Sequence, residues 1–285
     1  MTSFKFLTLC LFATSLTLSL QAQKAQLPQP TERQVYKTVG DTKLELWIYK
    51  PVDWKAADKR SAIVFYHGGG WRGGSPEAFS RQCEKLAKRG MVAMSVQYRL
   101  TSQQGVTLED CVKDARSAFR WVVAHAVDLG IDPAKIAAGG GSAGGHLAAS
   151  LVTLDQVNDV ADDLTIAIKP AALVLFNPAV NLDFPKAKEN RSAEEYLSMM
   201  KFNPYASLKA GHPPTIIFHG SADSTVPIQT VQDYAAKVKE LGGTCEVSVF
   251  EGRDHAFFNK EPDVWDTLKQ ADAFLQKQGL LSVAP

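Results

Sequence analysis

The stretch GGGSAGG, residues 139–145, decides how the rest of this chain is interpreted, because it fits two motifs at once. Residues 139–144 match GxGxxG, the glycine-rich turn that binds the pyrophosphate of a dinucleotide. Residues 140–144 also match GxSxG, a sharp strand-to-helix turn that exposes a nucleophilic serine, here Ser142. Both motifs lie between a strand and a helix, so the surrounding sequence has to distinguish them.

Short apolar runs alternate with amphipathic segments over most of the chain. The runs 35–39 and 44–49 flank Gly40-Asp41 and predict an antiparallel N-terminal hairpin. Six further strands are predicted at 62–66, 92–97, 135–138, 172–176, 215–219 and 246–250. Helices are predicted at 76–88, 108–127, 142–154, 229–241 and 264–276. This alternation predicts an α/β fold, with an eight-stranded, mostly parallel sheet and helices on both of its faces.

The domain organisation is predicted to be simple. No linker divides residues 23–285, which are expected to form a single domain. Residues 178–212 interrupt the pattern with Asn, Pro, Asp and Lys, and predict an insertion near the active site, over the edge where the strands end. The polar, proline-bearing residues 23–34 cannot form an apolar lid, and the insertion is rich in charge, so no large cap domain is expected.

The position of the glycines favours the nucleophile interpretation. A dinucleotide site usually follows the first strand and needs an acidic residue at the end of the next strand. Here the glycines follow the fifth predicted strand, and Asp162-Asp163 lie in a polar loop. A nucleophilic serine instead needs an acid and then a histidine in later loops. Asp223 follows the strand 215–219 and His255 follows the strand 246–250, in that order.

A loop after the third strand completes the pattern, because His67–Trp71 reads HGGGW where an oxyanion-binding loop is expected. With YHGGGW, GGGSAGG, GSADSTVP and the His255 loop, the chain resembles α/β-hydrolases of the HGGG-bearing esterase and lipase group. It is similar to small bacterial carbohydrate acetyl and feruloyl esterases over about residues 35–280. The resemblance implies a serine esterase, with acetyl or feruloyl esters of plant polysaccharide as expected substrates. The lack of an apolar lid predicts an open site, in which a long acyl chain would gain little burial, and therefore short-acyl carboxylic esters.

These residues have defined expected roles in ester hydrolysis. Ser142 is expected to attack the carbonyl carbon, His255 to accept its proton, and Asp223 to orient the imidazole. Three backbone N–H groups are expected to stabilise the oxyanion, those of Gly69, Gly70 and Ala143. Asp254 is a competing acid, but it is adjacent to His255 in sequence, and adjacent side chains seldom face each other.

Several alternatives remain open. Trp71 either lines the acyl site or only covers the glycine loop. The order serine, acid, histidine is shared by serine peptidases of the prolyl-oligopeptidase kind, although the HGGGW loop favours an esterase. A catalytically inactive binding module on the same fold is the third alternative, and the complete set of site residues argues against it.

The amino-acid composition limits the classes of binding partner and cofactor that are expected. Lys and Arg number 31 and Asp and Glu number 30, so no electrostatic feature indicates nucleic acid or an acidic membrane surface as a partner. No metal and no other cofactor is expected, because the cysteines match no metal-site spacing. Among Cys83, Cys111 and Cys245, the closest pair in sequence is Cys83 and Cys111, and export makes a disulfide between them possible. Alternatively, they and Cys245 are buried thiols.

Residues 1–22 have the layout of a secretory signal peptide, with Lys5 followed by an apolar stretch. We expect cleavage after Ala22, a periplasmic or secreted location, and no membrane span in the mature protein. Mass spectrometry of the protein from its native host should find an N-terminus near Gln23. An intact chain that begins at Met1 would contradict export.

Overall fold

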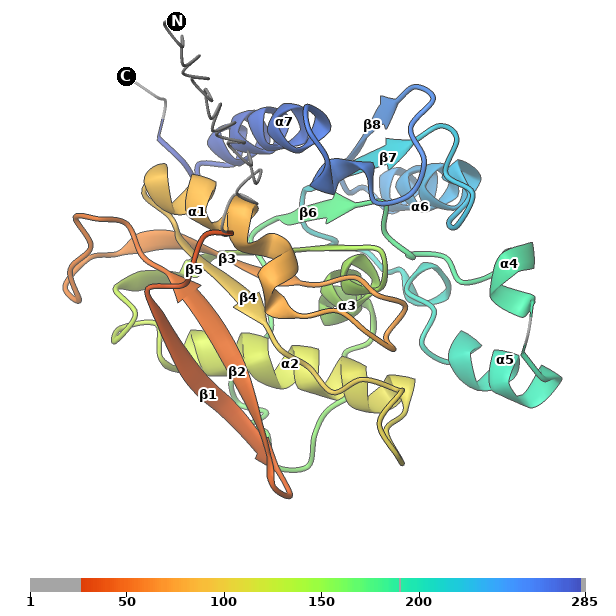
Figure 1. Ribbon diagram of the computed structural model, residues 1–285, viewed down its shortest axis with the longest axis horizontal. Helices are drawn as coiled ribbons and strands as arrows, with labels where there is room; N and C mark the ends of the chain where they lie inside the picture. Colours follow the sequence, from red (N-terminus) through yellow and green to blue (C-terminus); the bar gives the residue numbers. More distant parts are fainter. Residues whose placement is uncertain (1–26, 190, 283–285) are drawn as a thin grey trace, which may run out of the picture.

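The computed structural model describes residues 27–189 and 191–282, so the predicted signal peptide lies outside the described residues. Eight strands form one sheet in the order β1-β2-β4-β3-β5-β6-β7-β8 (Figure 1). They are β1 Glu32–Val39, β2 Thr42–Tyr49, β3 Arg60–Tyr66, β4 Val92–Val96, β5 Ile131–Gly141, β6 Leu173–Phe176, β7 Thr215–Gly220 and β8 Cys245–Phe250. β1 and β2 form the predicted antiparallel hairpin, β2 is antiparallel to β4, and all other neighbours are parallel. The predicted sheet is confirmed.

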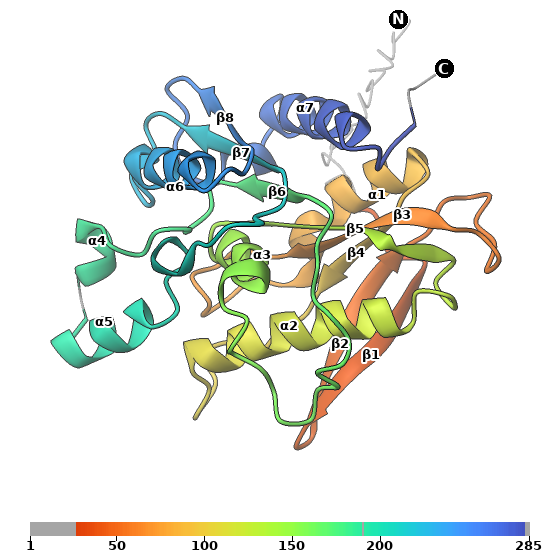
Figure 2. The same ribbon diagram turned by 180° about the vertical axis from the view of Figure 1, so that it is seen from behind.

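Helices cover both faces of this sheet (Figure 2). The α-helices are α1 Ser80–Lys88, α2 Leu108–Ala124, α3 Ala143–Thr153, α4 Pro185–Lys188, α5 Ala193–Met200, α6 Ile228–Glu240 and α7 Asp263–Lys277. Short 3₁₀ turns are η1 Pro76–Phe79, η2 Tyr205–Ser207 and η3 Phe257–Asn259. Helices α2, α3 and α6 pack on one face, and α1 and α7 pack on the other.

The central strand β3 is apolar and buried from Ala62 to Tyr66 because both of its faces are covered there. Val64 packs in the cluster beneath α2 and α3, whereas its neighbours Ile63 and Phe65 pack in the cluster beneath α1 and α7. A parallel strand buried on two sides has no polar face to alternate with, which explains the continuous apolar run in the sequence. The two cores therefore hold the middle of the sheet rigidly.

The parallel register brings the ends of four strands to one edge of the sheet. Tyr66 of β3 pairs with Gly140 of β5, and Gly220 of β7 pairs with Phe250 of β8. Loops that leave these strands must therefore meet above the same edge. The three predicted triad residues, Ser142, Asp223 and His255, lie in these loops, and His67 begins the predicted oxyanion loop.

Residues 178–212 form the segment beside this edge. They contain α4, α5 and η2, and both α-helices lie to the right of the sheet in Figure 1. The helices are short because Pro185 opens α4 and a capping box between Ser192 and Glu195 opens α5.

The three cysteines in the described residues are all free and buried. Cys83 lies on α1 in one core cluster, and Cys111 lies on α2 in the cluster on the opposite face of the sheet. The sheet separates the two thiols, so the disulfide alternative is wrong. Burial raises the pKa of Cys111 and that of Cys245 to about 12, which keeps both as neutral thiols.

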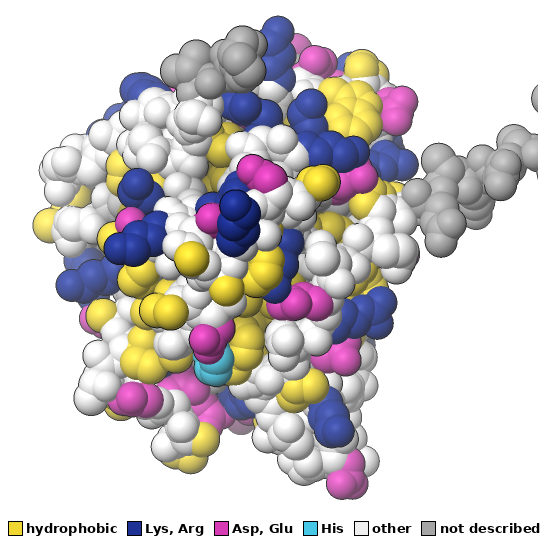
Figure 3. Space-filling model, turned by 90° about the vertical axis from the view of Figure 1, so that its left-hand side faces the viewer, with side chains coloured by type: hydrophobic (Ala, Val, Ile, Leu, Met, Phe, Trp, Pro, Cys, Tyr) yellow, Lys and Arg dark blue, Asp and Glu magenta, His cyan; other side chains and the backbone are white. Residues whose placement is uncertain are grey.

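The face at the amino ends of the parallel strands carries charges of both signs. Lys and Arg side chains are interspersed there with Asp and Glu (Figure 3), in line with the balanced composition. Of the helices in the described residues, none combines the length and the apolar character needed to cross a bilayer.

Candidate active site

Ser142 occupies a sharp turn between the last residue of β5 and the first residue of α3. Its backbone has φ 53° and ψ −117°, a conformation that is strained for any residue with a side chain. The predicted helix start at Ser142 is therefore wrong by one residue, and α3 begins at Ala143. The Ser142 side chain makes no helix-capping hydrogen bond. Its Oγ is instead available at the edge of the sheet.

Glycines surround this turn because the backbone of α3 passes very close to β3. A Cβ added to Gly144 would lie 1.9 Å from the carbonyl oxygen of Tyr66. A Cβ on Gly140 would lie 2.4 Å from the carbonyl oxygen of Gly144. Both distances are far below van der Waals contact, so the two glycines of GxSxG are required by packing.

The three predicted side chains of the triad meet at this edge. His255 Nε2 lies 2.9 Å from Ser142 Oγ, and His255 Nδ1 lies 2.8 Å from Asp223 Oδ2. The second oxygen, Asp223 Oδ1, accepts the backbone N–H groups of Thr225 at 2.9 Å and Val226 at 2.8 Å. Serine, imidazole and carboxylate thus form one continuous hydrogen-bonded chain.

The electrostatics of the carboxylate fit this arrangement. Burial alone would raise the pKa of Asp223, but the hydrogen bonds from His255 and from the Val226 and Thr225 N–H groups lower it below its usual range. The competing acid, Asp254, is exposed, and its carboxylate accepts the N–H and the hydroxyl of Ser224 at 2.9 and 3.0 Å. Asp223 is therefore the carboxylate that contacts the imidazole.

The predicted oxyanion loop faces the same serine. A Cβ on Gly68 would lie 3.4 Å from Ser142 Cβ, which places the loop beside the turn. Gly69 and Gly70 both have positive φ angles, 121° and 61°. Within the described residues the N–H groups of Gly69, Gly70 and Ala143 donate no hydrogen bond to the protein. These donors are free to bind a ligand oxygen.

Of the two roles that the sequence left open for Trp71, the structure supports the one beside Ser142. Trp71 lines the pocket beside Ser142, and its indole Nε1 donates to Nδ1 of His146 at 3.3 Å. His146 is fully buried under the turn, and burial lowers its pKa to about 4. The neutral imidazole can therefore accept from Trp71 and donate through Nε2 to the carbonyl of Phe202 at 2.7 Å.

Sequence reasoning did not identify Asn177, which follows β6. Asn177 is fully buried at φ 34°, and its Oδ1 accepts the N–H of Ala256 at 3.1 Å. Its Nδ2 lies 3.4 Å from His255 Nε2. Asn177 therefore fixes the loop that carries the histidine, and a buried asparagine in this strained conformation indicates a positional requirement.

His219, at the end of β7, also had no predicted role. Its Nε2 donates to the carbonyl of Val226 at 2.9 Å and lies 3.4 Å from Asp223 Oδ2. Burial lowers the pKa of His219, so the group behind the carboxylate is a neutral donor. A histidine immediately before Gly-x-x-Asp was the only sequence signal for this contact.

A pocket of about 160 Å³ opens beside Ser142, and we call it the serine pocket. Its apolar walls come mostly from residues 178–212 and include Ala179, Leu182, Phe184, Ala187, Met199 and Val226. The sequence predicts a charge-rich segment, and its Lys186 and Arg191 also line the pocket, but most of the side chains that it contributes to the lining are apolar. A second, outer pocket of about 420 Å³ adjoins it across Trp71 and Met199.

This fold and this arrangement of serine, histidine and aspartate define an α/β-hydrolase. The family model described as BD-FAE matches residues 46–238, more than half of the chain, and the chain belongs to this family. A model of the dienelactone hydrolase family also matches residues 199–282.

Known relatives are esterases. Esterase 2 of Thermogutta terrifontis with bound propionate is 46% identical, with a TM-score of 0.83, over 89% of this chain and 96% of that chain. The same esterase phosphorylated by paraoxon is also 46% identical, with a TM-score of 0.81 and the same coverage. Ethyl acetate hydrolase of Pseudomonas putida is 31% identical over 63% of this chain and 54% of its own length. A probable isoprenylcysteine alpha-carbonyl methylesterase of Arabidopsis thaliana is 25% identical over 80% of this chain. The chain spans about half the length of these last two relatives, 54% and 51%.

The assignment of the acid predicts different effects for two neighbouring carboxylates. Asp223→Asn should lower kcat by roughly three orders of magnitude or more, because the amide no longer stabilises the imidazolium or selects its tautomer. Asp254→Asn is the matched control and should leave kcat within about twofold, since its carboxylate is exposed and accepts hydrogen bonds from Ser224, not from the imidazole. Steady-state kinetics on p-nitrophenyl acetate measure both. A larger loss in Asp254→Asn would show that the wrong acid has been assigned.

Proposed function

We propose that this protein is an exported serine esterase that hydrolyses esters of short carboxylic acids. The observation that carries the proposal is the hydrogen-bonded chain from Ser142 Oγ through His255 to Asp223, at 2.9 and 2.8 Å, which faces a loop with unoccupied N–H donors. The likeness to esterases over nearly the whole length of a solved structure supports it.

The geometry supports a two-step reaction. Ser142 Oγ attacks the ester carbonyl carbon while its proton moves to His255 Nε2, and the carbonyl oxygen becomes an oxyanion. His255 then gives this proton to the alkoxide as the C–O bond breaks, so that the alcohol leaves and an acyl-serine remains. A water molecule repeats the attack with His255 as the base, which releases the carboxylic acid and restores Ser142. Asp223 stays ionised and stabilises the imidazolium in both steps.

The oxyanion is stabilised by fixed donors. The N–H groups of Gly69, Gly70 and Ala143 donate no hydrogen bond within the described residues. In the proposed reaction they bind the oxygen on which the negative charge develops, and each such donor typically contributes ~3 kcal/mol to the stability of the transition state. Ala143 is also the first residue of α3, so the positive end of the helix dipole lies at the same place.

The size of the serine pocket supports a short acyl group. Its volume is about 160 Å³, and its walls are mostly apolar side chains, with Lys186 and Arg191 also in the lining. Each buried CH₂ group contributes ~0.8 kcal/mol until the chain reaches the wall, after which further carbons gain nothing. The proposed preference for short chains thus rests on a small apolar pocket, in place of the open, charged site that the sequence suggested.

The alcohol part of the substrate is proposed to be a sugar. The outer pocket has a polar lining that includes Arg72, Thr101, Thr107, Glu194 and Ser198, which suits hydroxyl groups. The resemblance of the sequence motifs to carbohydrate acetyl and feruloyl esterases and the predicted export support acetyl or feruloyl esters of plant polysaccharide as substrates. The proposed location is periplasmic or secreted.

Two other functions would use the same residues, a prolyl-oligopeptidase-like serine peptidase and an inactive binding module. A fluorophosphonate probe, or paraoxon, should label the wild-type protein at Ser142 and should not label Ser142→Ala, because labelling requires an activated hydroxyl. Peptide mapping by mass spectrometry identifies the labelled residue. An unlabelled wild-type protein would favour the binding module. A labelled protein that cleaves prolyl peptides faster than esters would favour the peptidase.

The serine pocket predicts the chain-length profile. The value of kcat/KM on p-nitrophenyl esters should be highest from acetyl to butyryl and should fall beyond butyryl. Leu182→Ala should shift the optimum to longer chains because it enlarges the pocket. Leu197→Ala is the matched control, since Leu197 lies on α5 but is 63% exposed. An optimum at eight carbons or more would contradict the proposal, and acetylated xylan and feruloyl esters in the same panel test the sugar alcohol.

A further inference from the structure

The oxyanion loop is strained in a way that needs support from outside the loop. Trp71 has φ 60°, which is unfavourable for a residue with a side chain, and it follows two glycines that also have positive φ. A Cβ on Gly69 would lie 2.2 Å from the carbonyl oxygen of Gly73, so the loop is also tightly folded on itself. Such conformations persist only where surrounding contacts hold them.

The segment 98–102, which follows β4, supplies these contacts. Tyr98 Oη donates to the carbonyl of His67 at 2.8 Å, and the two rings stack with centroids 4.2 Å apart. The Thr101 N–H donates to the carbonyl of Trp71 at 2.8 Å. The hydroxyl of Ser102 donates to the carbonyl of Arg72 at 2.7 Å.

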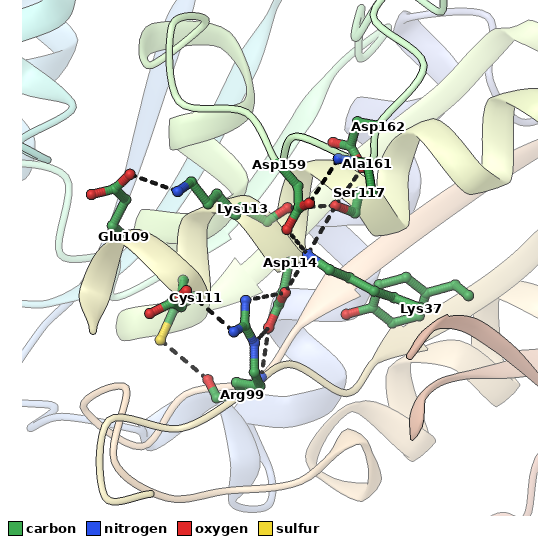
Figure 4. A network of polar contacts seen from close by, with 12 residues as sticks. Lys37, Arg99, Glu109, Cys111, Lys113, Asp114, Ser117, Asp159, Ala161 and Asp162 are labelled. Carbon is green, nitrogen blue, oxygen red and sulfur yellow. Dashed lines mark hydrogen bonds and ion pairs between the residues drawn. The ribbon is translucent and has the colours of Figure 1, made fainter. Parts of the chain in front are cut away.

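This segment is in turn fixed to α2 by Asp114, a carboxylate whose side chain is fully buried (Figure 4). Asp114 Oδ2 accepts Nε of Arg99 at 2.8 Å and the backbone N–H of Arg99 at 3.1 Å. Asp114 Oδ1 accepts Nη2 of Arg99 at 2.9 Å. The thiol of Cys111 adds a contact to the Arg99 carbonyl at 3.1 Å. The carboxylate of Asp114 therefore holds both the backbone N–H and the guanidinium of Arg99.

We propose that residues 98–102 form a brace that holds the oxyanion loop in its strained conformation, and that Asp114 anchors this brace. The inference rests on the proposed ester hydrolysis, because the brace acts by aiming the N–H groups of Gly69 and Gly70 at the oxyanion. Its members are positioning residues, since they act on the loop and do not touch the substrate's reacting atoms.

The polar network of Figure 4 also contains contacts that lead away from the site. Lys37 of β1 pairs with Asp114 and with Asp159, both at 2.7 Å. Arg120 of α2 pairs with Asp162 at 2.7 Å, and both of these side chains are about as buried as Arg99, at 9% and 10% exposure. Neither Lys37 nor Arg120 contacts the brace in the described residues. Arg120 therefore offers a control for general loss of stability.

The sharpest test removes contacts of the brace without disturbing the core. Ser102 is exposed, so Ser102→Ala should fold normally, and losing its hydrogen bond should lower kcat about threefold. Tyr98→Phe should lower kcat about tenfold because it also leaves the His67 carbonyl without its partner. KM and the pH profile of kcat should not change, since binding and the base are untouched. Ser248→Ala removes a side-chain hydrogen bond of the same length, 2.7 Å, on β8 and should keep the wild-type kcat.

Two kinds of inhibitor distinguish stabilisation of the oxyanion from binding to the rest of the site. A trifluoromethyl ketone forms a tetrahedral oxyanion with the serine, so its affinity should fall by the same factor as kcat/KM in both brace variants. Butyrate, a product-like carboxylic acid, forms no such adduct and should bind with unchanged affinity. Equal weakening of both inhibitors, or unchanged affinity for the ketone, would overturn the proposal.

The anchor is tested by comparing two ion pairs. Asp114→Asn and Arg120→Gln should both lower Tm, but only Asp114→Asn should lower kcat, by about tenfold at constant KM. Equal losses of kcat in the two variants, or unchanged kcat in Ser102→Ala and Tyr98→Phe, would refute the brace. A wild-type protein that neither hydrolyses esters nor reacts with a fluorophosphonate would instead refute the proposed function, and the brace with it.

Discussion

The close approach of α3 to β3 is the constraint on which the site depends. Tyr66 ends β3 beside Gly140 of β5, so the chain that leaves β5 must turn at once and pass over the Tyr66 carbonyl, where a Cβ on Gly144 would lie 1.9 Å away. This turn forces Ser142 to φ 53°. Two hydrogen bonds hold it there, from the Ser142 N–H to Phe176 and from the Ala179 N–H to the Ser142 carbonyl. The exposed position of the hydroxyl is thus a consequence of packing in the middle of the sheet.

Much of this arrangement could be predicted from the sequence, because a parallel sheet converts order along the chain into proximity. Ser142 and Asp223 follow the buried strands β5 and β7, His255 follows the edge strand β8, and the register brings those strand ends to one edge. Asn177 and His219 could not be predicted, since their contacts with the triad depend on a φ angle and on side-chain directions that leave no periodic pattern. The apolar pocket walls within residues 178–212 were hidden for a related reason. The average composition of residues 178–212 mixes side chains that line the pocket with side chains that face solvent. The charged residues dominate this average, so the apolar residues of the pocket wall are not apparent from it.

The histidines around the site differ in burial, and this difference separates those with a structural role from the one with a chemical role. His67 and His146 are buried, and burial lowers the pKa of each to about 4, so both stay neutral and serve as fixed hydrogen-bonding groups. His255 has 18% of its side chain exposed and lies 2.8 Å from Asp223 Oδ2, whose pKa is depressed. An ionised carboxylate at this distance stabilises an imidazolium. Neither His67 nor His146 has such a carboxylate partner in the described residues. One histidine can therefore accept a proton during the reaction while its neighbours keep the surrounding loops in place.

Backbone strain is concentrated in the same loops. In the described residues, positive φ angles outside glycine occur at four positions, Trp71, Ser142, Asn177 and Ala256. Each lies in a loop that follows a strand of the sheet, and together they surround the reacting serine and histidine. Each such conformation costs roughly 1 kcal/mol or more and persists only where the surrounding structure holds it. Their clustering around Ser142 and His255 therefore indicates a positional requirement at this site. The rigid sheet and the hydrogen bonds to each loop offset this cost during folding. In the proposed reaction, the imidazole and the N–H donors of the oxyanion loop are consequently held in place before any substrate arrives, and little reorganisation is left for the transition state.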